Sequence, residues 1–168
     1  WMTAGNGIEH SEMPQQKDGL LRGFQVWLNL PAKEKMKPAD YRDIQADEIP
    51  RADLASGGQI RLIAGELPLG EVRLVGPGSS EATRPLIADV LLRPNEEAAL
   101  PMLSGHSALF YVFEGEVILD GETVPAHHTA LLSDGDLLDV RAGRKGGRFL
   151  LLAAKPLREP VVQYGPFV

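Results

Sequence analysis

Residues 108–120 read ALFYVFEGEVILD, and this stretch decides the fold class. Aliphatic and aromatic residues lie on both sides of Glu114-Gly115, which is typical of two β-strands. The pattern predicts a hairpin with its turn at Glu114-Gly115. Asp120-Gly121 follows at once and predicts a second tight turn.

Short apolar runs continue the strand pattern on both sides of this stretch. Eighteen glycines and thirteen prolines separate them and favour short strands over long helices. Strands that recur about every 8–12 residues predict an all-β sandwich or barrel. Residues 94–98 are expected to form a loop, and the glycine-rich RAGRKGGR of residues 141–148 a solvated hairpin tip. The expected strands are residues 59–64, 71–75, 86–92, 129–132, 137–140 and 148–154.

Composition excludes several function classes. The 168 residues carry a net charge of −6, which argues against a nucleic-acid-binding surface because phosphate contacts need clustered Lys and Arg. The chain has no cysteine and hence no disulfide framework. No apolar run reaches the ~18 residues of a membrane span, and no secretion signal is present. A cytoplasmic protein without membrane contact is expected.

The N-terminal stretch WMTAGNGIEHSEM, residues 1–13, carries a candidate metal-binding pair. Gly5-Asn6-Gly7 predicts a tight turn between two strands. In a strand, His10 and Glu12 would leave the same face and form a two-ligand claw for a divalent metal. An isolated H-x-E is more often an exposed surface pair, so both interpretations stay open. The alternating GFQVWLNL of residues 23–30 predicts a further strand.

Longer blocks of the chain closely resemble the pirin family of bicupins. These are WMTAGNGIEHSEMP at residues 1–14, GFQVWLNLPAKEKMKPADYRDI at 23–44, PAHHTALLSDGD at 125–136 and LREPVVQYGPFV at 157–168. The resemblance implies a cupin fold, which is a double-stranded β-helix or jelly-roll barrel. It also implies one complete C-terminal barrel in residues 51–168 and a remnant of an N-terminal barrel in residues 1–50. The tail would return to the first domain, with Tyr164 and Phe167 packed over it.

The resemblance implies one metal, Fe(II) or another divalent ion, in the N-terminal barrel. In the family, three histidines and one glutamate hold it, and His10 and Glu12 match two of these ligands. The other two belong to an H-x-H motif upstream of Trp-Met-Thr-Ala-Gly. These 168 residues contain no H-x-H, so the site is incomplete. The second barrel is expected to bind no metal. Of His127 and His128, one is expected at the surface and the other hydrogen-bonded in the barrel wall, and His106 is expected to be structural or solvent-facing.

Three hypotheses follow for function. The first is quercetin 2,3-dioxygenase-like oxidation of a flavonol, with Glu12 as ligand and general base and Trp1, Met2 and the Gly5–Gly7 turn lining the pocket. The second is a redox-sensitive regulatory protein that binds protein partners as a transcription cofactor, in the nucleus if the source is eukaryotic. The third is a cupin remnant without a site. Exposed strand edges in residues 1–30 would favour a homodimer.

Overall fold

The computed structural model describes residues 1–14 and 16–165. The chain forms two compact units, described separately below. The first comprises residues 1–43 and the chain from Leu157 onward, and the second is Ile44–Pro156. The domain boundary expected near residue 50 stays a prediction, because compact units need not coincide with family domains.

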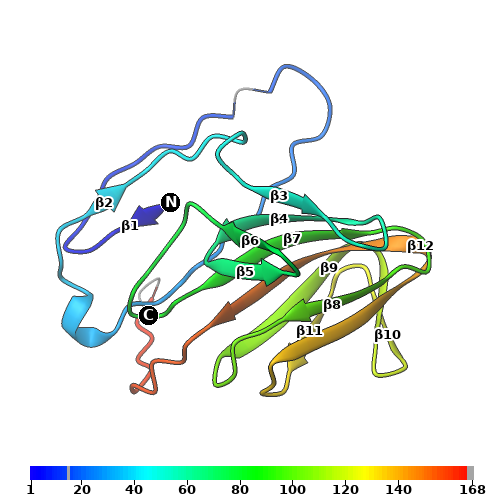
Figure 1. Cartoon of the computed structure of the whole chain (residues 1–168). Coiled ribbons are helices and arrows are strands. Elements are labelled where there is room, and N and C mark those ends of the chain that lie inside the picture. Colours follow the sequence, from blue (N-terminus) through cyan, green and yellow to red (C-terminus); the bar gives the residue numbers. More distant parts are fainter. Residues whose placement is uncertain (15, 166–168) are drawn as a thin grey trace. The chain divides into compact units, whose positions relative to one another are not determined.

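The second unit is built from β-strands, and the all-β prediction is confirmed (Figure 1). An eight-stranded antiparallel sheet holds all its strands except β5 and β6, which form a separate hairpin. The strands are β3 (Arg51–Asp53), β4 (Gln59–Ala64), β5 (Glu66–Leu69), β6 (Val72–Val75), β7 (Leu86–Leu92), β8 (Glu97–Pro101), β9 (Ser107–Leu119), β10 (Glu122–Pro125), β11 (His128–Leu132) and β12 (Leu137–Ala154).

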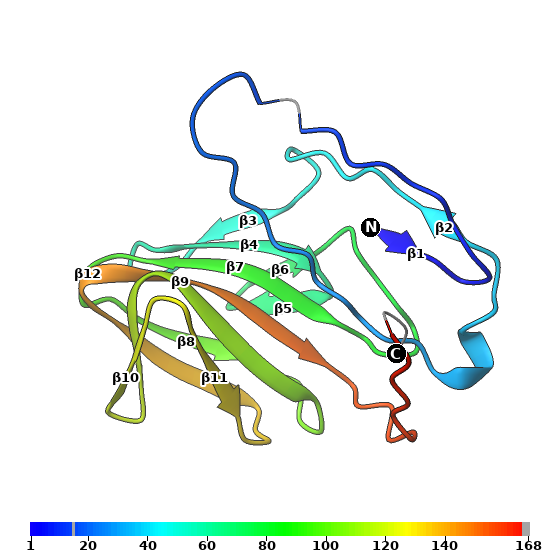
Figure 2. The same cartoon turned by 180° about the vertical axis from the view of Figure 1, so that it is seen from behind.

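Two long strands, β9 and β12, organise this unit, and Figure 2 shows them from behind. They pair with each other along most of their length. The first part of β12 also pairs with β8, and its last part with β7. Likewise, the first part of β9 pairs with β11 and its last part with β10. Each long strand therefore contributes to two groups of strands, which folds the sheet around a common interior.

Glycines allow the two long strands to bend together. The β9–β12 register shifts between Ala142 and Gly147, opposite Gly115. Gly115 has φ 67°, and a Cβ there would collide with the carbonyl oxygen of Gly146. The predicted turn at Glu114-Gly115 and the predicted hairpin tip at residues 141–148 were both wrong. Each is a bend inside a continuous strand, because the glycines admit a β-bulge without ending the ladder.

The interior is apolar and closed to solvent. Phe110 and Phe149 are fully buried, with ring centroids 5.1 Å apart and planes tilted by 52°. Leu62, Leu100 and Val112 are also fully buried, so β4, β8 and β9 share one core with β12. Burial of such side chains contributes about 1.5–3 kcal/mol each.

Other strand predictions are mostly confirmed. Strands β4 and β7 have the predicted bounds, and Asp120-Gly121 forms the predicted turn with φ 51° and 85°. Strand β8 begins at Glu97, inside the expected loop, because the first part of β12 gives it a partner.

The first unit has little regular structure. It contains β1 (Met2–Thr3) paired with β2 (Asp40–Tyr41) and the 3₁₀-helix η1 (Ala32–Glu34). The predicted turn is confirmed: Gly5 has φ 53°, and the Gly7 N–H donates to the Ala4 carbonyl at 2.9 Å.

The strands predicted over residues 8–13 and 23–30 are wrong, since both segments are irregular. An alternating pattern yields a strand only where a neighbour completes the ladder, and no described strand pairs with either segment. Trp27 is accordingly 76% exposed, and Tyr164, expected to pack, is 81% exposed. Phe167 lies outside the described residues.

No helix in residues 1–14 and 16–165 has the length and apolar character needed to cross a membrane.

Candidate functional site

The predicted ligand pair lies on an irregular segment of the first unit. His10 Nε2 and Glu12 Oε1 are 3.8 Å apart, and their side chains are 45% and 67% exposed. The segment is not a strand, yet the i,i+2 spacing still brings the imidazole and the carboxylate to the same side. The closeness of the two groups was therefore predicted correctly, but the strand that was expected to bring them together does not form.

Gln25 is a neighbour of this pair that sequence reasoning missed. Its side-chain amide donates to both carboxylate oxygens of Glu12, at 3.3 Å each. Thirteen residues separate the two side chains, and Gln25 was interpreted only as a polar position of a strand. Nothing in its local pattern signals the contact, which depends on how the chain returns past residues 10–12.

The His10–Glu12 pair fits two positions of a divalent metal site. Two donors that are each about 2.1 Å from one ion lie at most about 4.2 Å apart. The observed 3.8 Å satisfies this limit, and imidazole with carboxylate is a donor set that suits iron and zinc. Among the described residues, however, no group of three or more His, Cys, Asp or Glu could hold a metal. The pair is therefore at most part of a metal site within this part of the chain.

Backbone hydrogen bonds fix the residues expected to line the pocket. The Trp1 amino group donates to the Arg42 carbonyl at 2.8 Å, and the Arg42 N–H donates back to the Trp1 carbonyl at 2.9 Å. The Asn6 N–H donates to the Lys37 carbonyl at 2.8 Å. Residues 1–6 are thus tied to residues 37–42. That Trp1, Met2 and Gly5–Gly7 line a pocket stays a prediction.

The three other histidines lie in the second unit. His127 and His128 are exposed: Tyr111 Oη lies 3.3 Å from His127 Nδ1, and His128 Nδ1 lies 3.1 Å from the Ala126 carbonyl oxygen. His127, with φ 68°, lies in the turn before β11, and His128 is the first residue of that strand. His127 thus lies at the surface, as expected for one of the pair. The other was expected within the barrel wall, and His128 does lie on a barrel strand, but it is also exposed. His106 is half-buried in the loop before β9.

The fold of the second unit and its relatives define the chain as a cupin, and the cupin prediction is confirmed. A crystal structure of quercetin 2,3-dioxygenase from Acinetobacter baumannii matches with a TM-score of 0.74 and 30% identity, covering 84% of this chain and 48% of that one. The family description "Pirin C-terminal cupin domain" matches residues 87–168, and "Pirin" matches residues 1–28. The chain belongs to the pirin family.

Curated relatives agree with this assignment. A Pseudomonas aeruginosa protein named "Putative quercetin 2,3-dioxygenase" is 44% identical over 171 residues, covering 100% of this chain and 60% of the relative. A Thermoplasma acidophilum protein of the same name is 32% identical over 187 residues, covering 100% of this chain and 70% of the relative. Human pirin is 36% identical over 175 residues, covering 100% of this chain and 57% of the relative. The chain thus spans little more than half the length of two of these three relatives.

Proposed function

We propose that this chain supplies part of a metal-dependent dioxygenase that acts on a flavonol-like substrate. The observation that carries the proposal is the 3.8 Å approach of His10 and Glu12, two residues that match metal ligands of the pirin family. The names of the bacterial and archaeal relatives support the reaction class. The remaining ligands in the family come from an H-x-H motif that these 168 residues do not contain.

His10 and Glu12 would hold Fe(II) or another divalent ion. Such an ion, when bound, supplies coordination positions at which a deprotonated flavonol and dioxygen meet. Glu12 is also suited to accept the hydroxyl proton of the flavonol, since its carboxylate is a proton acceptor that would lie beside the metal-bound substrate. Gln25 would orient that carboxylate by donating to both of its oxygens.

Metal binding and turnover test the proposal directly. Manganese(II) added to ¹⁵N-labelled protein should broaden the amide signals of residues 9–13, and the His10→Ala change should abolish this effect. His127→Ala is the matched control, because it removes another exposed imidazole. Flavonol absorbance followed under air with added Fe(II) measures turnover. Unchanged broadening and unchanged Fe(II)-dependent loss of absorbance in His10→Ala would contradict the assignment of His10.

A second candidate function is the binding of a protein partner or a second copy of this chain. Large apolar side chains are exposed in the first unit: Met13, Leu20, Leu21 and Trp27 are each more than 60% exposed. The strand edges expected to mediate a homodimer do not form over residues 8–13 and 23–30, so side chains rather than an open ladder would mediate this contact.

Size-exclusion chromatography with light scattering tests self-association. We expect dimers at micromolar concentrations that dissociate in a Leu20→Ser, Trp27→Ser double variant. A monomer at every concentration, without any added protein, would refute the homodimer.

A further inference from the structure

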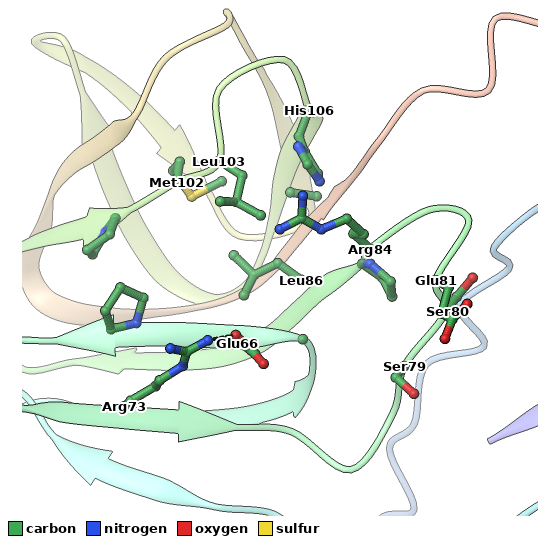
Figure 3. A pocket seen from close by; sticks show the side chains of 15 residues that line it. Glu66, Arg73, Ser79, Ser80, Glu81, Arg84, Leu86, Met102, Leu103 and His106 are labelled. Atoms are coloured by element: carbon green, nitrogen blue, oxygen red, sulfur yellow. Dashed lines mark hydrogen bonds and ion pairs between the residues drawn. The ribbon is translucent and has the colours of Figure 1, made fainter.

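The second unit contains a cavity of about 500 Å³ that is separate from the His10–Glu12 pair, and all its lining residues belong to this unit (Figure 3). It lies among the β5–β6 hairpin, the loop before β7 and the loop between β8 and β9. Its volume is within the range of small-molecule sites. Its lining combines an apolar part, Leu86, Met102 and Leu103, with the polar side chains of Arg84 and His106.

The backbone of Arg84 is held in an unfavourable conformation beside this cavity. Arg84 has φ 44°, and it precedes Pro85, which disfavours α conformations at the residue before it. The Arg84 N–H donates to the Ser80 carbonyl at 2.8 Å, and the Lys155 N–H donates to the Thr83 carbonyl at 2.7 Å. Strain that the surroundings fix in this way is characteristic of binding sites, because it aims a side chain.

Arg84 is also the cation of the cavity that is left without a counter-ion. Arg73, the other arginine of the lining, forms an ion pair with Glu66. Arg84 forms no ion pair with any residue in the described part of the chain. Figure 3 shows its guanidinium turned toward His106, whereas the Glu81 carboxylate lies further along the loop. Glu81 also lines the cavity, so the two arginines and two glutamates of the lining balance, and the positive charge is local to the exposed Arg84 side chain beside His106.

His106 adds hydrogen-bonding capacity that the protein itself does not use. Both of its ring nitrogens are shielded from solvent and have no hydrogen-bond partner among residues 1–14 and 16–165. An imidazole always carries at least one N–H donor, so this arrangement is costly unless a further acceptor is supplied. The loop that carries the ring is well fixed: the His106 N–H donates to the Leu103 carbonyl at 3.2 Å, and the Gly105 N–H donates to Asp134 Oδ1 at 2.6 Å.

We propose that this cavity is a second ligand site that takes a small organic acid. The ligand's carboxylate would pair with the Arg84 guanidinium. The His106 ring would turn so that one of its shielded nitrogens donates to the same carboxylate. Its hydrocarbon part would pack on Leu86, Met102 and Leu103. A charge-assisted pair with the guanidinium fixes the carboxylate end, and the apolar lining distinguishes an organic acid from an inorganic anion. This site involves none of the residues assigned to the metal, so it stands independently of the proposed dioxygenase.

The probe is 3-phenylpropionate, titrated into the ¹⁵N-labelled 168-residue protein. We expect saturable shifts of the amide signals of residues 80–86 and 102–107. Arg84→Met should weaken binding about tenfold or more, because it removes the charged donor but keeps the aliphatic stem. Arg144→Met is the matched control, since Arg144 is exposed on β12 outside the cavity. This variant should bind 3-phenylpropionate as tightly as the parent protein does. His106→Phe keeps a ring of similar size and should also weaken binding, so a misfolded Arg84 variant does not end the test.

Two matched compounds define the ligand class. The neutral 3-phenylpropan-1-ol and inorganic phosphate should each bind at least about tenfold more weakly than 3-phenylpropionate. Several outcomes would overturn the proposal: no saturable shifts with 3-phenylpropionate, unchanged affinity in both the Arg84→Met and His106→Phe variants, or equal affinity for the alcohol. Equal affinity for phosphate would show a general anion contact in place of an organic-acid site.

Discussion

The two units of this chain respond differently to the same kind of sequence pattern. In the second unit, alternating and apolar stretches form strands whose side chains close a core, as at Leu62 and Phe149. In the first unit, the equally regular residues 23–30 form no strand and leave Trp27 exposed. The difference shows that an alternating pattern makes a segment able to form a strand. Whether the strand forms depends on the presence of a partner strand.

The largest expected effect is the loss of a core side chain in the second unit. Phe149→Ala should lower the free energy of unfolding by about 3–5 kcal/mol, because it leaves a cavity beside Phe110 and removes the ring contact. Trp27→Ala removes a larger side chain from the first unit, but it should change the free energy of unfolding by less than about 0.5 kcal/mol. Urea denaturation followed by far-ultraviolet circular dichroism measures both. Similar losses in the two variants would break the comparison between the units.

A substitution at the bend of the long strands should lower the stability of the protein nearly as much. Gly115→Ala should cost about 2–3 kcal/mol, because it places a Cβ at φ 67° and against the Gly146 carbonyl. Gly70→Ala is the matched control: φ is 59° there, but nothing lies within 4 Å of the added atom. It should cost only about 1 kcal/mol from backbone strain. Equal thermal midpoints for the two variants would show that the β9–β12 bend tolerates a side chain.

These cases show which parts of the fold could be predicted from the sequence. Strands β4 and β7 could be delimited because their apolar residues are continuous or alternate and turn residues flank them. The bends at Gly115 and Gly146 were mistaken for turns because a glycine signals a permissive φ and does not say whether the chain reverses. The distinction depends on the partner strand, which local sequence does not contain.

The candidate site divides in the same way. The closeness of His10 and Glu12 could be predicted, since two residues of i,i+2 spacing remain near each other in many extended conformations. Gln25 could not, because its contact with Glu12 spans a long irregular segment. Arg84 and His106 could not be connected either. They lie on separate loops that meet only through the folding of the sheet, and the local sequence predicted a structural or solvent-facing role for His106.

A buried carboxylate tests whether polar contacts also distinguish the second unit. Glu96 is 6% exposed and accepts hydrogen bonds from Ser56 Oγ at 2.6 Å and from the backbone N–H groups of Arg93, at 2.7 Å, and Gly58. Burial acts to raise the pKa of Glu96, but these hydrogen bonds and the Arg93 charge lower it overall. Glu96→Gln should therefore cost about 2 kcal/mol at pH 7, since hydrogen bonds to a charged acceptor are weakened. Glu97→Gln, at an exposed neighbour, should be neutral.

The pH dependence of this effect has a definite sign. Because the pKa of Glu96 is lower in the folded than in the unfolded protein, its carboxylate stabilises the fold above the unfolded value of about 4.3. That contribution is lost as the pH falls through the folded pKa. The stability difference between the parent protein and Glu96→Gln should be constant from pH 6 to 7 and shrink below about pH 4.3. A difference that grew on acidification would contradict the hydrogen-bonded carboxylate.

The smallest expected effect compares two ion pairs within the second unit. Arg148 donates from Nε to Asp89 Oδ1 at 2.8 Å and from Nη2 to Asp89 Oδ2 at 2.6 Å, and its guanidinium lies 5.2 Å from the centre of the Phe113 ring. The hydrogen bonds to Asp89 raise the pKa of Arg148. Arg148→Met should cost about 1–2 kcal/mol, with Arg61 still 3.7 Å from Asp89.

The Arg73–Glu66 pair has the same chemistry, but its side chains are 67% and 54% exposed, so Arg73→Met should cost less than about 0.5 kcal/mol. Both costs should be measured by urea denaturation at low and at high salt. Added salt should weaken the effect of Arg73→Met further and leave that of Arg148→Met nearly unchanged, because partial burial shields the Arg148–Asp89 pair from screening. Equal costs at low salt would mean that hydrogen-bond geometry and burial do not separate the two pairs.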